Sequence, residues 1–328
     1  MNKMRRWNSY SENLIQRYGY KVYRIGVDGG FTCPHRDSTR TKGGCIFCDS
    51  QGAVSVYHRK AESGFTHESA FEENIDRTVC TVRVAPLEEQ VRRGMEFVRR
   101  RYGAEHFAIY FQSYSNTYAP VERLREIYDR ALSIYDWEGL IVSTRPDCMD
   151  REKAALLSSC REKAGSVCVE LGLQSGSDRI LKLMRRGHDV KSFLEAASIV
   201  KDEGLELCVH VLTGFPGEGR EELDKTIEVI NRVHPHAIKI HNLNVASGTP
   251  LYEKYLEGEV HAPSTERHLW TCVYFLRRIP QDIVIERLIC ETPSHRLASP
   301  RAFSDKNRFL RSLEAIMEEN NYRQGDLI

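Results

Sequence analysis

The sequence predicts an α/β fold, a partial (β/α)6 TIM-like barrel followed by a C-terminal α/β extension. Short apolar runs alternate with longer helical patterns up to residue 243. Proline and glycine residues stand at several of the expected helix ends, which supports those boundaries. After Leu243 the alternation stops and a different order of elements begins. We therefore expect a barrel over residues 1–245 and an extension packed on it over residues 246–328.

The expected barrel strands are short apolar runs bounded by turn residues. They cover residues 21–27, 106–112, 139–143, 166–171, 205–212 and 237–243. Helical patterns between them cover residues 86–101, 120–135, 151–161, 190–203 and 221–234. Pro86 and Pro120 suit a first helical turn, and Gly204 suits the position after a helix end. Strand–helix alternation of this kind implies right-handed crossovers and a parallel sheet.

The C-terminal region follows another pattern. Residues 249–257, 264–278 and 305–320 are expected to be helical, and residues 283–290 to form a strand. In parallel α/β folds, ligands lie at the carboxyl ends of the strands. The residues that follow each barrel strand are therefore the candidates for function.

Composition excludes some classes of protein. The formal net charge is +1, so no overall field favours nucleic acid or a membrane surface. No stretch approaches the ~20 apolar residues of a membrane helix, and the polar start does not resemble a signal peptide. A cytoplasmic protein is expected. In a reducing cytosol the ten cysteines are not expected to form disulfides.

Three cysteines lie close together in a glycine-rich loop after the first strand. Cys33, Cys45 and Cys48 have the spacing C-x11-C-x2-C. Thiolates are the ligands of iron–sulfur clusters, and a loop allows three of them to converge on one cluster. Three ligands leave one iron of a [4Fe–4S] cluster open to chelate S-adenosylmethionine (SAM) and to start radical chemistry. The pattern predicts such a site.

A zinc site is the alternative for this loop. Cys33, His35, Cys45 and Cys48 would form a closed Cys3His structural site. The other seven cysteines are scattered, and we interpret them as structural. The position of the C-x-x-C pair after the first strand of an α/β pattern favours the cluster.

Motifs along nearly the whole chain resemble the YhcC/YtqA-like (MnmL-like) radical SAM family, which is related to the Elongator catalytic subunit. The resemblance is carried by residues 30–37 (GFTCPHRD), 43–48 (GGCIFC), 110–120 (YFQSYSNTYAP), 143–148 (STRPDC), 170–175 (ELGLQS), 186–189 (RGHD), 214–218 (GFPGE) and 239–241 (KIH). It implies a radical SAM barrel that binds a [4Fe–4S] cluster and SAM.

The resemblance also implies which residues contact SAM. They are Phe47 at the adenine, Gln112, Ser113, Asn116 and Ser143 near the methionine amino group, Gln174 and His210 near the ribose, and Arg186 at the methionine carboxylate. Glu170, on the fourth strand, is a further expected cofactor-binding residue. Structural interpretations stay open beside these. Phe47 would anchor the loop in the core, Arg186 would be a solvated charge beside Arg185, and His210 would be a core histidine.

Kinship with the Elongator subunit points to tRNA wobble uridine, with processing of a 5-carboxymethylaminomethyl side chain. An electron donor such as flavodoxin or ferredoxin is expected too. Residues 1–30 carry six basic against two acidic side chains among several aromatics, so we expect them to bind tRNA at the mouth of the barrel. The alternatives are a radical enzyme acting on a small metabolite or peptide and a non-catalytic, zinc-stabilised nucleic-acid-binding protein.

Overall fold

The computed structural model describes residues 5–35, 44–48, 85–303 and 305–328. Within these ranges, seven parallel strands form one sheet in the order β1-β2-β3-β4-β5-β6-β8. Their bounds are β1 (Val22–Val27), β2 (His106–Phe111), β3 (Gly139–Thr144), β4 (Val167–Gln174), β5 (Glu206–Thr213), β6 (Ala237–Asn242) and β8 (Val284–Arg287). The expected parallel α/β fold is confirmed.

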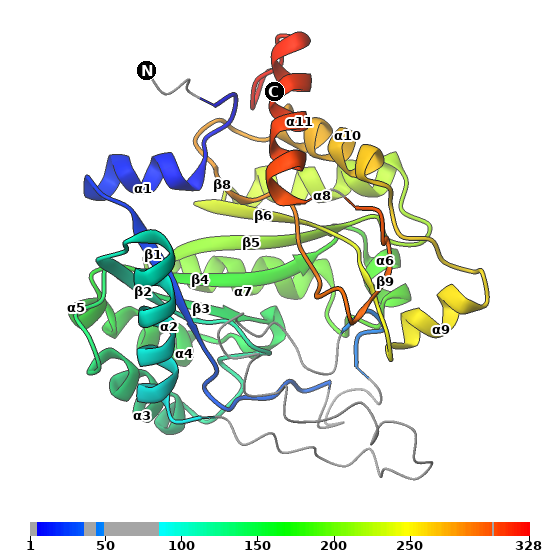
Figure 1. The fold of residues 1–328 in the computed structure, drawn as a ribbon. Coiled ribbons are helices and arrows are strands. Elements are labelled where there is room, and N and C mark those ends of the chain that lie inside the picture. The colour runs from blue at the N-terminus through cyan, green and yellow to red at the C-terminus, as the bar shows by residue number, and fades with distance from the viewer. Residues whose placement is uncertain (1–4, 36–43, 49–84, 304) are drawn as a thin grey trace.

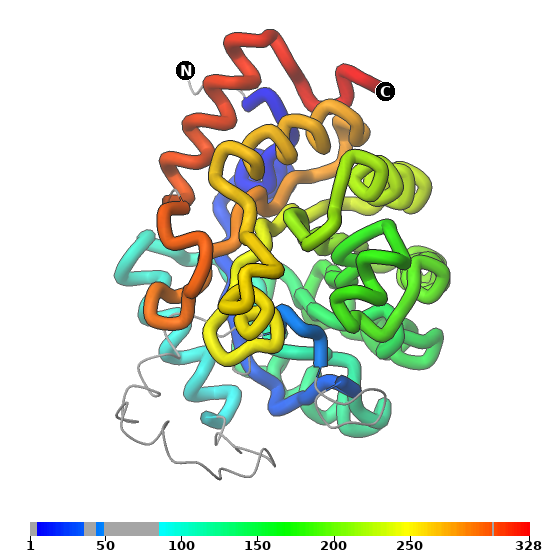
Figure 2. Tube along the Cα trace, turned by 90° about the vertical axis from the view of Figure 1, so that its right-hand side faces the viewer, coloured from blue at the N-terminus to red at the C-terminus, as the bar shows by residue number. Residues whose placement is uncertain are grey.

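Helices connect consecutive strands and cover the outer side of the curled sheet (Figure 1, Figure 2). They are α2 (Leu87–Tyr102), α3 (Val121–Leu132), α4 (Arg151–Ser159), α5 (Arg161–Ala164), α6 (Asp178–Leu183), α7 (Val190–Asp202) and α8 (Arg220–Val233), with a short 3-10 turn at Pro146–Cys148. The sheet curls into a half-barrel, which confirms the predicted partial barrel.

The two faces of the sheet differ in chemistry because side chains alternate along each strand. On β4, Val169, Leu171 and Leu173 join the large apolar core beneath the helices. Cys168 belongs to a second cluster of mostly smaller inward-facing residues, and Glu170 lies two residues further along the same face. The interior of the half-barrel therefore contains polar and small side chains rather than a continuous apolar filling.

The C-terminal region contributes to the same sheet. Strand β8 pairs with β6, and the region adds α9 (Pro250–Leu256), α10 (Thr265–Leu276) and α11 (Lys306–Glu319). A small antiparallel pair joins β7 (Val245–Ala246) to β9 (Leu297–Ser299). Helices α10 and α11 supply Phe275 and Phe309 to the main core.

Three local predictions differ from the structure. Strand β4 ends at Gln174 rather than at residue 171, so Gln174 lies inside the strand and not after it. The expected helix 151–161 is divided at Cys160 into α4 and α5. Helix α6 was not predicted. Cys80 lies outside the described residues.

The basic and aromatic N-terminal segment does not line the mouth of the barrel. It forms helix α1 (Tyr10–Tyr18), which lies across the amino ends of the strands (Figure 1). There Arg17 pairs with Glu206 at 2.5 Å, and the Tyr18 hydroxyl lies 3.3 Å from the Ser166 hydroxyl. A cavity of about 700 Å³ lies between α1 and the strand starts. The expected position of this segment is wrong.

No helix within the described ranges has both the length and the apolar character needed to span a membrane.

Candidate active site

The cysteine loop is fixed at the carboxyl ends of the strands by backbone hydrogen bonds from three directions. The Ile46 amide donates to the Met184 carbonyl at 3.2 Å, just after α6. The Leu251 amide at the start of α9 donates to the Ile46 carbonyl at 2.9 Å. The Ser115 amide, beyond β2, donates to the Thr32 carbonyl at 3.2 Å. The loop therefore takes its position from the barrel and from the C-terminal region.

Two guanidinium groups approach the thiol of Cys45. Its Sγ lies 3.6 Å from Arg186 Nη1 and 3.8 Å from Arg145 Nη1. Burial raises the pKa of this thiol, but Arg186, a hydrogen bond with His35 and Arg145 together lower it to about 6. The described structure thus favours a thiolate at Cys45, which is the form that binds metal.

Arg145 is fully buried and holds the parts of the site together. It pairs with Asp147 through Nε at 2.8 Å and Nη2 at 3.1 Å. The same Nη2 lies 2.9 Å from His35 Nε2 and donates to the Arg186 carbonyl at 2.7 Å. Burial lowers the pKa of Arg145, while Asp147 and the nearby cysteines, Cys33 among them, raise it. Arg145 therefore stays charged beside the thiols.

Arg186 is buried, which excludes a solvated surface charge. Its Nη2 donates to the Gly172 carbonyl at 3.2 Å, and a side-chain Cβ on Gly172 would lie 2.6 Å from that nitrogen. A side chain at position 172 would displace this nitrogen. Among the described residues, Arg186 Nε is buried without a hydrogen-bond partner. A buried N–H group without an acceptor costs free energy unless a ligand accepts its hydrogen bond. The position of Nε therefore fits an anionic group such as a carboxylate.

The donor set fits the expected cofactors. Three thiols stand on one loop, one of them has a lowered pKa, and two fixed guanidinium groups balance negative charge. Thiolate ligands and a carboxylate acceptor are what an iron–sulfur cluster with SAM requires. His35 Nε2 is already hydrogen-bonded to Arg145 Nη2, which weighs against His35 as the fourth ligand of a zinc ion.

Asn116 connects the ends of two neighbouring strands. Its Nδ2 donates to the Phe111 carbonyl at 3.1 Å and to the Ser143 carbonyl at 2.8 Å. Its backbone amide also donates to Ser143, and its Oδ1 is buried without a described partner. Ser113 is also buried, and Gln112 is half-buried. Asn116 therefore positions this edge of the site and presents one free acceptor.

Phe47 and Gln174 lie on the rim of the site. Phe47 is half-buried and packs against Phe215 of the Gly-Phe-Pro-Gly turn, with ring centroids 5.7 Å apart. Gln174 ends β4 with a positive φ of 71°, and its Nε2 would lie 2.6 Å from a Cβ on Gly172. The loop-anchor role of Phe47 is thus observed, and its exposed part stays available to a ligand.

Glu170 lies deeper in the barrel than the sequence suggested. Its Oε1 accepts from Arg24 at 3.1 Å and from Lys239, and its Oε2 accepts from Tyr110 at 2.6 Å and from His210 Nε2 at 2.9 Å. Burial raises the pKa of Glu170, but Lys239 and then His210 lower it well below the usual value. All its strong acceptor positions are used by the protein.

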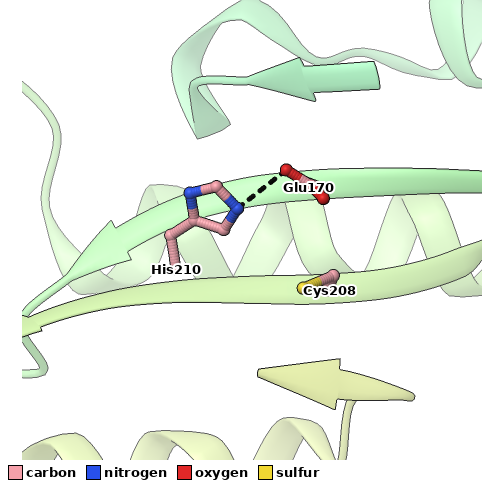
Figure 3. A group of neighbouring side chains, drawn as sticks. All are labelled: Glu170, Cys208 and His210. Atoms are coloured by element: carbon pink, nitrogen blue, oxygen red, sulfur yellow. Dashed lines mark hydrogen bonds and ion pairs between the residues drawn. The ribbon is translucent and has the colours of Figure 1, made fainter. Parts of the chain in front are cut away.

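Besides the three cysteines of the loop, Glu170, Cys208 and His210 form a group of possible metal ligands inside the half-barrel (Figure 3). Their ligand atoms lie within 4.8 Å of one another. The pKa of the Cys208 thiol is raised well above its usual value, chiefly by burial, and Glu170 already pairs with Lys239. A protonated thiol and a neutralised carboxylate are poor ligands, so we assign no metal here.

Arg145 is the residue of the site that single-residue reasoning missed. The motif around it carries the family resemblance, but an arginine after a strand has no signature that separates it from a surface charge. Its pairing with Asp147, two residues later, becomes visible only once the short turn at Pro146–Cys148 folds both side chains inward.

Known families and proteins match this chain along most of its length. The model of the Radical SAM superfamily matches residues 32–230, and that of the Radical_SAM C-terminal domain matches residues 235–319. The chain is 30% identical to YhcC of Escherichia coli over 293 residues, which cover 89% of this chain and 86% of YhcC.

Two further matches are a sequence match over about half of the chain and a structural match over most of it. The chain is 33% identical to the tRNA uridine(34) acetyltransferase of Methanocaldococcus infernus over 160 residues, 48% of this chain and 29% of that protein. The structure of Elp3 from the same archaeon, lacking an N-terminal segment, superposes with a TM-score of 0.67 at 20% identity, covering 92% of this chain and 64% of that one.

Proposed function

The chain belongs to the radical SAM superfamily, and on this premise we propose that it processes the 5-carboxymethylaminomethyl side chain of the tRNA wobble uridine toward the aminomethyl form. Membership makes it an enzyme and supplies its cofactors, a [4Fe–4S] cluster and SAM. A non-catalytic zinc protein is thereby set aside.

The described residues divide the work of holding these cofactors. We propose Cys33, Cys45 and Cys48 as the ligands of the cluster, with Arg145 and Arg186 balancing its charge. When bound, the cluster and SAM supply a 5′-deoxyadenosyl radical that removes a hydrogen atom from the substrate. An electron donor such as flavodoxin or ferredoxin completes the proposal.

The proposed contacts with SAM follow the geometry of the rim. Arg186 binds the methionine carboxylate through its unpartnered Nε. The further proposed contacts are Phe47 at the adenine, Gln174 at the ribose, and Gln112, Ser113, Asn116 and Ser143 around the amino group. Both oxygens of Glu170 already accept hydrogen bonds from the protein, so Glu170 is not proposed to contact the ribose. It acts on the site through its hydrogen bond with His210.

One observation carries the choice of substrate. About half of this chain aligns with a protein named for its action on uridine 34 of tRNA. The fold of Elp3 extends the similarity to nearly the whole chain. A relative that works on the same nucleoside by another reaction favours a shared tRNA substrate over a small metabolite or peptide.

Mass spectrometry of bulk tRNA nucleosides tests this proposal. A deletion strain should accumulate 5-carboxymethylaminomethyl uridine and lose the aminomethyl form. The intact gene should restore the pattern, and a Cys45→Ala variant should not. An unchanged nucleoside profile in the deletion strain, with the gene normally expressed in the parent, would contradict the tRNA substrate and favour a small metabolite or peptide.

A further inference from the structure

A histidine held by a carboxylate lies inside the half-barrel and has no role in holding the cluster. His210 on β5 points toward Glu170 on β4, with Nε2 and Oε2 2.9 Å apart (Figure 3). A carboxylate accepts hydrogen bonds, so Nε2 carries the proton. The other ring nitrogen, Nδ1, then carries a lone pair. No described residue donates to it.

Glu170 is held as an anion and cannot itself take up a proton easily. Lys239 and Arg24 bind one of its oxygens, and the Tyr110 hydroxyl donates to the other. Glu286 pairs with the same two cations, with Arg24 at 2.6 Å and with Lys239 at 3.4 Å, so two positive and two negative side chains balance one another. A fixed carboxylate of this kind orients an imidazole and stabilises the imidazolium that forms on protonation.

His210 lies next to the residues that hold the cluster loop. It is paired in the sheet with Gly172, whose carbonyl accepts from Arg186 Nη2 at 3.2 Å. The same guanidinium lies 3.6 Å from Cys45 Sγ. Figure 3 shows Nδ1 on the side of the strand arrowheads, toward the carboxyl ends. The His210 side chain is 15% exposed, so a ligand in the barrel can reach it.

We propose that His210 is the proton acceptor for the substrate and that Glu170 is its positioning residue. This inference rests on the proposed function. The substrate group is a protonated amine beside the carbon that loses a hydrogen atom. Its N–H bond breaks, the electron pair stays on nitrogen, and the proton bonds to His210 Nδ1. The freed lone pair stabilises a radical on the adjacent carbon, which an ammonium cannot do.

The surroundings of His210 keep it neutral and ready to accept. The groups that face it are Arg24 on β1, Tyr110 on β2, Glu170 on β4, Lys239 and His241 on β6, and Glu286 on β8. Burial and Lys239 lower the pKa of His210, and Glu170 opposes them only in part. Burial also keeps His241 neutral, because its pKa falls well below the usual value.

The first test needs no substrate. The reconstituted full chain is labelled with 15N-histidine, and the His210 ring is assigned by its loss in His210→Gln. We expect a neutral ring at pH 7 in the Nε2–H tautomer. A ring that is protonated at pH 7, or that carries hydrogen on Nδ1, would overturn the proposal, because Nδ1 would have no lone pair to accept a proton.

The second test measures turnover of tRNA from the deletion strain. His210→Gln should keep its iron content but lose about 10²- to 10⁴-fold in nucleoside product. The wild-type rate should fall in acid, at a pH below the usual range of a free imidazole, because burial and Lys239 lower the pKa of His210. The His210→Gln variant should lack this loss of rate in acid. Glu170→Gln should move this loss of rate to lower pH.

The matched control is His106→Gln. His106 also pairs with a glutamate, at 2.8 Å from Glu138, but at the amino end of β2. It should behave as wild type. If His210→Gln kept the wild-type rate of nucleoside formation and the same loss of rate at low pH, the role of His210 would be overturned, and the proposed function would stand. A wild-type enzyme with no tRNA product would contradict the proposed function, and with it the amine substrate assigned to His210.

Discussion

At the scale of single residues, Arg186 is the clearest example of a side chain shaped by what it must bind. One terminal nitrogen faces Cys45, the other faces the Gly172 carbonyl, and Nε has no described partner. The missing side chain at Gly172 makes this placement possible. A guanidinium held at both ends is pre-organised for a third acceptor, so binding costs little further ordering.

Arg186→Ala should therefore weaken SAM binding while leaving the iron content unchanged. Loss of one charge-assisted hydrogen-bonded pair should cost on the order of 1.5–3 kcal/mol, or roughly 10- to 150-fold in affinity. Isothermal titration of SAM into the reconstituted enzyme measures this. Arg185→Ala, at the exposed neighbouring position, is the control and should bind as wild type. Equal affinity in both variants would remove Arg186 from the SAM site.

The three cysteines give a second prediction at this scale. Cys33→Ala, Cys45→Ala or Cys48→Ala should each abolish the reconstituted cluster, because three thiolates are the full proposed ligand set. Iron analysis and absorbance near 400 nm after anaerobic reconstitution report the result. Cys148→Ala is the matched control, since its thiol is buried and its pKa is raised to about 12, chiefly by burial. Retention of four irons per chain in any of the three variants would contradict the assignment of these cysteines as the cluster ligands.

At the scale of elements, the turn after α6 connects the cluster loop to the sheet. Gly187 has a φ of 74°, and a Cβ there would lie 2.1 Å from the His35 ring. His35 in turn contacts Arg145, which reaches Cys45. The close approach of this turn therefore keeps the imidazole and the guanidinium in place.

Gly187→Ala should damage this arrangement more than backbone strain alone would. Gly19 has a similar φ of 81° but no atom within 4 Å of an added Cβ, so Gly19→Ala measures strain by itself. That strain should cost about 1–2 kcal/mol in the free energy of unfolding. Gly187→Ala should cost more, and should also lower iron incorporation. Urea unfolding compares the two, and equal losses with normal iron content would contradict the steric role of Gly187.

The elements that sequence patterns predicted are those with strong apolar periodicity. The six expected barrel strands and the long helices α2, α7 and α8 all form near the predicted positions. The sequence predicts too short a strand β4, because Gly172 and Gln174 are residue types typical of a loop. In the structure, Gly172 stands inside the strand and leaves room for Arg186. The family, which the match to YhcC confirms, implies a role for Arg186 but does not give its contacts.

Helix α1 and the polar interior could not be predicted in the same way. No residue of α1 is buried, because its apolar stripe of Tyr10, Leu14 and Tyr18 lines the cavity at the strand starts and does not join the main core. Lys239 and Glu170 come from strands 69 residues apart in sequence, and their pairing depends on the curl of the sheet. This pairing leaves no local pattern in the sequence.

At the scale of the whole molecule, the two ends of the half-barrel differ in structure. The carboxyl ends hold the cysteine loop, and the amino ends are covered by α1 (Figure 1). Between them lies the ion-paired layer around Glu170, which separates the site from the cavity under α1. A substrate that meets the radical must therefore enter from the carboxyl ends.

This arrangement predicts where tRNA is not bound. Arg6 bonds to Asn321 at 2.9 Å and Arg5 lies over Trp7, both near the amino-end cover. Changing Arg5 and Arg6 together to alanine should leave the salt dependence of tRNA binding unchanged. A slope smaller by roughly one unit per lost phosphate contact would instead place this segment in the tRNA interface. Filter binding between low and high salt measures the slope.

The formation of 5′-deoxyadenosine tests the central claim most directly. The enzyme is reconstituted anaerobically, reduced, and given SAM with tRNA from the deletion strain or with fully modified tRNA from the parent strain. We expect slow 5′-deoxyadenosine formation without tRNA, clear stimulation by deletion-strain tRNA, and none by parental tRNA. No 5′-deoxyadenosine from an enzyme with a full cluster would contradict the radical function, and equal rates with both tRNAs would contradict the tRNA substrate.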